Sequence, residues 1–110
     1  MAGWRGYING KHFTQYYDEA MQLKREKKYD LAINLFLKIA DATEAESQRD
    51  GLGVASGSYE QLAIIYRKLY LLEKEKQILV RCSKQNHGAS GMPLKLYERL
   101  GILNAKYPNL

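Results

Sequence analysis

Hydrophobic side chains recur every three to four residues in five stretches of the chain. This spacing places them on one face of an α-helix. Polar or glycine-containing segments separate most of the stretches. The pattern therefore predicts an all-α fold with five helices, over residues 13–27, 30–42, 58–70, 72–85 and 93–106.

The connections between these stretches predict how the helices pair. A short turn at residues 27–30, with Asp30 as the expected N-cap, joins the first two helices, and a similarly short connection joins the third and fourth. Helices joined in this way pack as antiparallel hairpins. Residues 43–50 are polar and helix-compatible, and residues 51–57 are rich in glycine. We expect one domain over residues 13–106, made of hairpin 13–42, loop 43–57, hairpin 58–85, loop 86–92 and capping helix 93–106, with a tail at 107–110.

The N-terminal segment lacks the helical periodicity. Residues 1–12 contain three glycines and the turn signal Asn9-Gly10, which predict an irregular arm. Trp4 and Tyr7 are expected to pin this arm to the first helices, because aromatic side chains bury a large apolar area. The alternative is a flexible arm that recognises a partner.

One spacing occurs three times, in the first, third and fifth helices. A large residue is followed four positions later by a small one, and three positions after that by a further residue, which is large in the first two copies. The small residues allow helices to approach closely, and the large ones fill the space around them. The three copies are Tyr16, Ala20 and Leu23; Tyr59, Ala63 and Tyr66; and Tyr97, Gly101 and Asn104.

With these residues, and with Ala32 and Phe36 in the second helix, the chain resembles the tetratricopeptide repeat (TPR) family over residues 13–106. The resemblance implies a short right-handed TPR-like solenoid of about two and a half repeats, whose fifth helix caps the stack. The chain departs from the family pattern at Glu19, where leucine is preferred, and at Glu44 and His87, where the closing proline is missing. Its small residues lie 43 and 38 positions apart, against a family period of about 34.

The resemblance also implies where a partner binds. The family holds peptide segments in a concave groove lined by the first helix of each pair. By register, the partner-binding residues of this chain would be Tyr17, Met21, Lys24, Arg25, Ile64, Arg67, Lys68, Ile102 and Lys106. Thr14, Glu60, Lys95 and Glu98 fall on the same face.

The residue types of this groove indicate the chemistry of the partner. Lysine and arginine form charge-assisted hydrogen bonds with carboxylates, and the apolar side chains offer a hydrophobic contact. We therefore expect a protein or peptide partner with an acidic and apolar segment. The alternative is that Tyr17, Met21 and Ile64 belong to the core. Tyr17 and Met21 stand where a TPR subclass places the lysine and asparagine that grip a terminal carboxylate, so we do not expect that specificity.

Two alternatives to a protein-interaction groove are nucleic-acid binding and self-association. The formal net charge is +5, which also suits a nucleic acid held by Lys24, Arg25, Arg67, Lys68 and Lys106. The second alternative is a self-associating module, a homodimer formed through an exposed end of the helical stack. A non-enzymatic protein-interaction module remains our first expectation, because basic and acidic residues are interspersed along the helices.

Chemistry at a catalytic or metal centre has little support. His12, His87 and the single cysteine Cys82 do not cluster in the sequence, and residues 51–57 match no nucleotide-binding pattern. We expect no enzyme activity, no metal site and no cofactor. One cysteine suits a reducing compartment, the first residues lack a signal-peptide core, and no apolar run reaches the roughly 18 residues of a membrane span. We therefore expect a cytoplasmic protein with no membrane partner.

Overall fold

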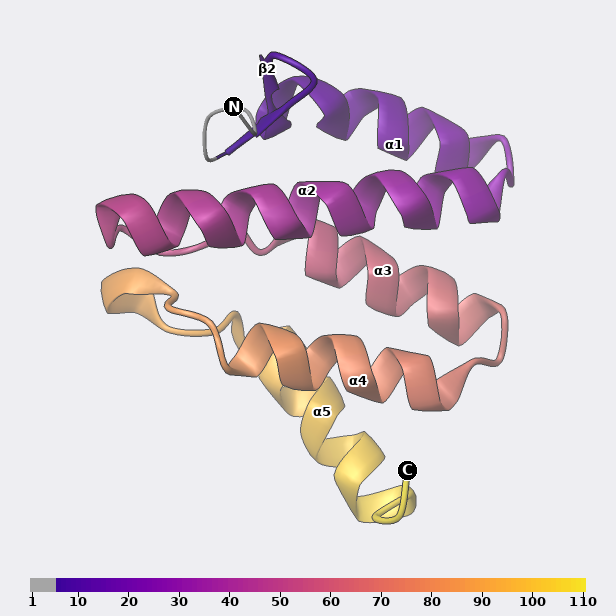
Figure 1. Ribbon diagram of the computed structural model, residues 1–110. Coiled ribbons are helices and arrows are strands. Elements are labelled where there is room, and N and C mark those ends of the chain that lie inside the picture. Colours follow the sequence, from indigo (N-terminus) through magenta and orange to yellow (C-terminus); the bar gives the residue numbers. More distant parts are fainter. Residues whose placement is uncertain (1–5) are drawn as a thin grey trace.

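The computed structural model describes residues 6–110 and confirms the all-α class (Figure 1). Its α-helices are α1 (Tyr17–Arg25), α2 (Tyr29–Asp50), α3 (Gly57–Lys68), α4 (Leu72–Ser83) and α5 (Leu94–Lys106). Each helix packs chiefly against the one before it and the one after it. Figure 1 shows α1 with α2 and α3 with α4 as antiparallel pairs, and α5 oblique to α4.

The N-terminal segment is more regular than the sequence indicated. Strands β1 (Tyr7–Ile8) and β2 (Lys11–His12) pair antiparallel around the Asn9-Gly10 turn, where both φ angles are positive. A 3₁₀ helix, η1 (Phe13–Tyr16), leads into α1. Phe13 is buried and anchors this segment, whereas Tyr7 of β1 is 43% exposed and so only partly covered. Trp4 lies outside the described residues.

Helix α2 continues eight residues beyond the end that the polar segment suggested, so the first long connection begins at Gly51 and not at residue 43. Thr43 and Ser47 stay buried on the inner face of this extension, where the Thr43 hydroxyl accepts a hydrogen bond from the Ala55 backbone at 2.8 Å. Gly51 then ends the helix in the left-handed conformation that glycine adopts readily. Helix α1 begins at Tyr17, four residues after the expected start, because the 3₁₀ helix η1 takes residues 13–16; the remaining helix bounds agree with the expected ones within two residues.

The two hairpin turns have the same geometry, displaced by 43 residues. Lys27 and Tyr70 both adopt a left-handed conformation, with φ of 60° and 58°. In the first turn the Lys28 amide bonds to the Leu23 carbonyl, and in the second the Leu71 amide bonds to the Tyr66 carbonyl, 2.9 and 2.8 Å away. These bonds form the Schellman motif that closes many helices. The sequence repeat therefore corresponds to a repeat of backbone structure.

The third copy of the repeated spacing differs from the first two. Ala20 and Ala63 are buried between helices, whereas a Cβ atom at Gly101 would meet no atom within 4 Å. Tyr97 is 65% exposed, although periodicity placed it inward, and Leu31 of α2 is likewise exposed. No second helix follows α5 within the described residues, so the face that carries Gly101 has nothing to pack against.

Candidate functional site

A cavity of about 360 Å³ lies between α3 and α5. Successive turns of each helix supply its lining, because residues three or four positions apart share a helical face. The floor is apolar, and the rim is charged. Ala63, Ile64, Leu96 and Ile102 form the floor, and Glu60, Arg67, Lys95, Glu98 and Arg99 form the rim.

The two rim arginines are held by one buried carboxylate. Glu75 of α4 is fully buried, and its Oε2 accepts a hydrogen bond from Arg67 Nε at 3.0 Å. Arg99 approaches it with two nitrogens, Nε at 2.8 Å from Oε2 and Nη2 at 2.9 Å from Oε1. Because a buried charge needs a partner of opposite sign, this cluster ties α3, α4 and α5 together.

The cluster still has hydrogen-bonding capacity toward the cavity. Arg67 uses only its Nε in the pair with Glu75, which leaves its two terminal nitrogens outside that pair, and its side chain is 47% exposed. The hydrogen bond with Glu75 also raises the pKa of Arg99, so this guanidinium stays charged. The arrangement can therefore offer fixed cationic donors to a carboxylate that enters beside the apolar floor.

The other end of the rim is closed by a surface ion pair. Lys95 Nζ lies 2.6 Å from Glu60 Oε1, with the lysine side chain 69% exposed. Glu98 is exposed on the same rim. A pair with one largely exposed partner contributes little to stability, so it can be exchanged for contacts with a ligand.

Helix α1 borders the same face through α3. Lys24 Nζ donates a hydrogen bond to Gln61 of α3, and partial burial together with the nearby Lys68 charge lowers the Lys24 pKa. The ring of Tyr17 lies against Gly57, at the start of α3, and edge-on to Phe36. Burial raises the Tyr17 pKa. Tyr17 thus contributes to the core as well as to the surface.

The structure gathers some, but not all, of the residues that the sequence assigned to a groove. Ile64, Arg67 and Ile102 line the cavity. Tyr17, Met21 and Lys24 are half-buried and do not line it, and Lys68 is an exposed neighbour of Lys24. Neither Arg25 nor Lys106 lines the cavity, and Arg25 bonds within its own helix to Gln22.

Sequence reasoning missed Arg99 and the support of Glu75. A signal for both was present, because Glu75 occupies an inward-facing position of its helix, where a carboxylate requires a cation. Arg99 follows Lys95 by four residues on one helical face. What the sequence did not reveal is that Arg99 meets Glu75, 24 residues away.

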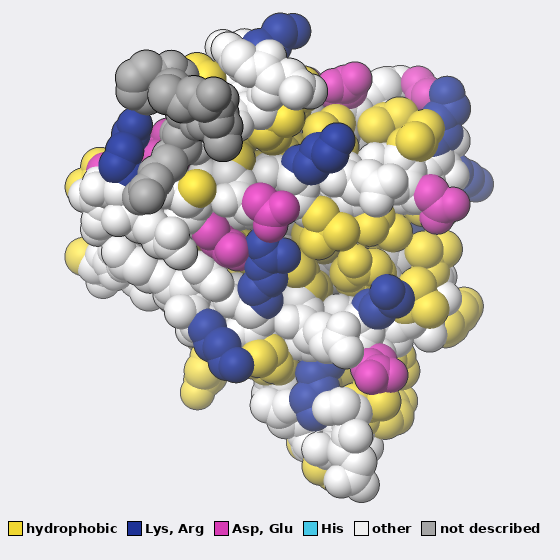
Figure 2. All heavy atoms as spheres, viewed as in Figure 1, with side chains coloured by type: hydrophobic (Ala, Val, Ile, Leu, Met, Phe, Trp, Pro, Cys, Tyr) yellow, Lys and Arg dark blue, Asp and Glu magenta, His cyan; other side chains and the backbone are white. Residues whose placement is uncertain are grey.

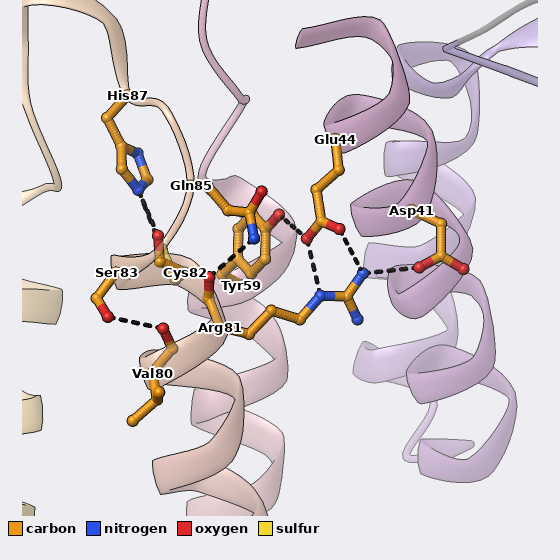
Figure 3. A network of polar contacts seen from close by, with 9 residues as sticks. All are labelled: Asp41, Glu44, Tyr59, Val80, Arg81, Cys82, Ser83, Gln85 and His87. Atoms are coloured by element: carbon orange, nitrogen blue, oxygen red, sulfur yellow. Dashed lines mark hydrogen bonds and ion pairs between the residues drawn. The ribbon is translucent and has the colours of Figure 1, made fainter. Parts of the chain in front are cut away.

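A second polar network lies between the two hairpins (Figure 3). Arg81 of α4 reaches across to α2, with Nε 2.8 Å from Glu44 Oε2 and Nη2 2.7 Å from Asp41 Oδ1. Tyr59 of α3 donates its hydroxyl proton to the same Glu44. Glu44 and Asp41 raise the pKa of Arg81. Burial is the main cause that raises the pKa of Tyr59, and its hydrogen bond with Glu44 raises this pKa further.

The other reactive side chains do not converge on the cavity. Cys82 is fully buried, and burial raises its pKa to about 11, which keeps it a thiol. His87 Nε2 lies 2.6 Å from the Cys82 carbonyl, and His12 Nε2 lies 2.6 Å from Glu46, in the N-terminal hairpin region. Among residues 6–110, no three His, Cys, Asp or Glu side chains form a group that could hold a metal. Across the same residues, no helix is both long and apolar enough to cross a membrane.

Comparisons with known proteins do not assign the chain to a family. No protein family model, curated protein or solved structure matches this chain. A function must therefore be argued from the cavity and its charges.

Proposed function

We propose that the chain is a non-enzymatic protein-interaction module with a TPR-like arrangement of helices. The single observation that carries the proposal is the cavity between α3 and α5, with its apolar floor and two arginines held by Glu75. The hairpin turns that repeat after 43 residues support the TPR-like arrangement. A cavity of this size holds one or two side chains of a partner segment.

The chemistry of the cavity indicates which residue types a partner segment should carry. A large apolar side chain on Ala63, Ile64, Leu96 and Ile102 would remove exposed apolar surface from water. An acidic side chain next to it in the segment would meet the terminal nitrogens of Arg67. The proposed ligand is therefore a protein segment with an acidic residue adjacent to a large apolar one.

A peptide-display selection on the immobilised full chain tests the proposal. Peptides that bind are made with a fluorescent label, and their affinity is measured by anisotropy. We expect the selected peptides to share an acidic and a large apolar residue. Truncating Ile102→Ala should weaken binding about tenfold, because a cavity contact of this size contributes about 1.5 kcal/mol.

Leu94→Ala is the matched control, because Leu94 is on the same helix and 68% exposed but does not line the cavity. It should leave the affinity within about twofold of that of the unmodified chain. Equal losses for the two variants, or selected peptides without an acidic residue, would contradict the assignment of the cavity.

A further inference from the structure

The two hairpin connections form one edge of the molecule, at the right of Figure 1. We call this edge, residues 24–31 and 67–74, the hairpin-tip edge. Leu31 of the first segment and Leu69 of the second line the same surface hollow. Leu69 and Leu71 line a neighbouring hollow together with Asp30. The two segments therefore lie side by side, although they are 43 residues apart in the sequence.

Large apolar side chains protrude from this edge. Tyr70 is 88% exposed, and Leu31, Leu69 and Leu71 are also exposed. Proteins in water seldom expose large apolar side chains as a contiguous group. In Figure 2, hydrophobic side chains are frequent over the right-hand half of the face shown, with basic and acidic side chains among them. The apolar groups thus gather at the place where the two connections meet.

The edge also holds most of the molecule's excess positive charge. Its two segments contain seven lysines and arginines and three acids, a net charge of +4 out of +5 for the chain, although one of the seven, Arg67, is paired with Glu75 outside the edge. One of the acids, Glu26, is already paired with Lys28 at 3.1 Å. Burial and then the nearby charge of Lys68 lower the Lys24 pKa, so these two lysines are close neighbours.

We propose that the hairpin-tip edge binds the surface of an anionic lipid bilayer. Its basic residues would meet the lipid headgroups, while Leu31, Tyr70 and Leu71 enter the boundary with the acyl chains. A nucleic acid would satisfy the basic residues but would leave exposed leucines without an apolar environment. This contact needs no membrane-spanning helix, and it differs from the sequence-based expectation of no membrane partner.

The backbone of the two turns allows a clean test. Lys27 and Tyr70 hold left-handed conformations that favour glycine. Substituting either by glycine removes a charged or aromatic side chain without straining the fold. A loss of lipid binding in these variants is then separable from unfolding.

The experiment is co-sedimentation of the full chain with vesicles of phosphatidylcholine alone or mixed with phosphatidylserine. We expect sedimentation with the mixed vesicles, weakening as salt is added. Tyr70→Gly should lower the partition coefficient about tenfold. Lys27→Gly should lower it about fivefold. Leu52→Ala and Lys84→Ala, which alter exposed residues away from this edge, should leave it unchanged.

Three results would overturn the inference. The first is that neither vesicle sediments the chain, and the second is that Tyr70→Gly and Lys27→Gly bind as well as the unmodified chain. The third is binding to single-stranded or duplex DNA without binding to anionic vesicles, which would assign the edge to nucleic acid. Thermal unfolding of each variant, read by circular dichroism, verifies that the fold is retained.

Discussion

Glu44 and Glu75 are carboxylates that each tie neighbouring helices together, but their surroundings differ. Glu44 joins Arg81 and Tyr59, and it shares Nη2 of Arg81 with Asp41 (Figure 3). Glu75 faces two arginines, one of which keeps its terminal nitrogens outside the pair and lines a cavity. Two acids therefore share one cation in the first network, whereas two cations share one acid in the second. Arg81 also lines a hollow, so the difference lies in the charge that each network leaves over: the first has an excess negative charge, and the second an excess positive charge that suits an acidic ligand.

The largest expected effect comes from removing both cations from Glu75. Arg67→Met together with Arg99→Met leaves a fully buried carboxylate without a partner. We expect a loss of about 3–5 kcal/mol in the free energy of unfolding, measured by urea denaturation. Arg67→Met alone should cost less than about 1 kcal/mol, because its side chain is half exposed and Arg99 remains.

A rescue variant sharpens this prediction. Adding Glu75→Leu to the double variant removes the unpaired charge and should recover most of the lost stability, because apolar residues often replace buried ion pairs without loss. If the triple variant is no more stable than the double one, packing by the arginine side chains matters more than their charge.

The Glu44 network should be less sensitive, because its acids are not fully buried. Glu44→Gln removes the charge that bonds Arg81 and Tyr59 while keeping the side-chain size. We expect a loss of about 1–3 kcal/mol in thermal or urea unfolding. Asp41→Asn, which alters a 70% exposed partner of the same arginine, should change stability by no more than about 0.5 kcal/mol. Equal effects would show that the two acids hold Arg81 equally.

Alkaline pH should weaken the region around Glu44 before it affects the Glu75 cluster. Burial raises the pKa of Cys82 from 9.0 to about 11, and the Tyr59 pKa is raised above 10.0. Both groups are neutral when protonated, so the folded state retains protons that the unfolded chain releases. The contribution of these two groups to stability should stay constant below about pH 9 and fall as the pH rises toward 11 and beyond. Urea unfolding across this range measures the decrease, and Cys82→Ala should remove its part between pH 9 and 11.

The smallest effect is expected at the rim of the cavity. Lys95→Ala breaks the pair with Glu60, in which the lysine side chain is 69% exposed. The free energy of unfolding should change by no more than about 0.5 kcal/mol. A larger loss in urea denaturation would show that this pair is part of the structural frame and not an exchangeable rim contact.

Helix positions could be predicted well from the sequence, and the site less so. Periodicity identified the five helices, but it ended the second one at residue 42, because residues 43–50 are polar. Thr43 is buried there because a later backbone amide, that of Ala55, bonds its hydroxyl. A pattern of local polarity carries no information about such a distant partner.

The groove residues show the same limit. Helical register correctly placed Ile64, Arg67 and Ile102 on one face, and the structure brings them to one cavity. Register also assigned Arg25 and Lys106 to this face, but neither reaches the cavity. Whether a residue near a helix end reaches a neighbouring helix depends on the angle between the helices, and the oblique placement of α5 is a property of the packing (Figure 1).

The sequence by itself determined the all-α class, the two short hairpin turns and their 43-residue repeat, because these depend on side-chain spacing and local backbone preference. The tertiary structure alone decided that Glu75 meets Arg99, that Arg81 reaches Glu44 and that Gly101 faces open space. These outcomes depend on which helices become neighbours. Glu75 and Arg99 are separated by 24 positions in the sequence, and Glu44 and Arg81 by 37, so neither pair has a local sequence signal of its contact. The candidate site arises from that second set of contacts.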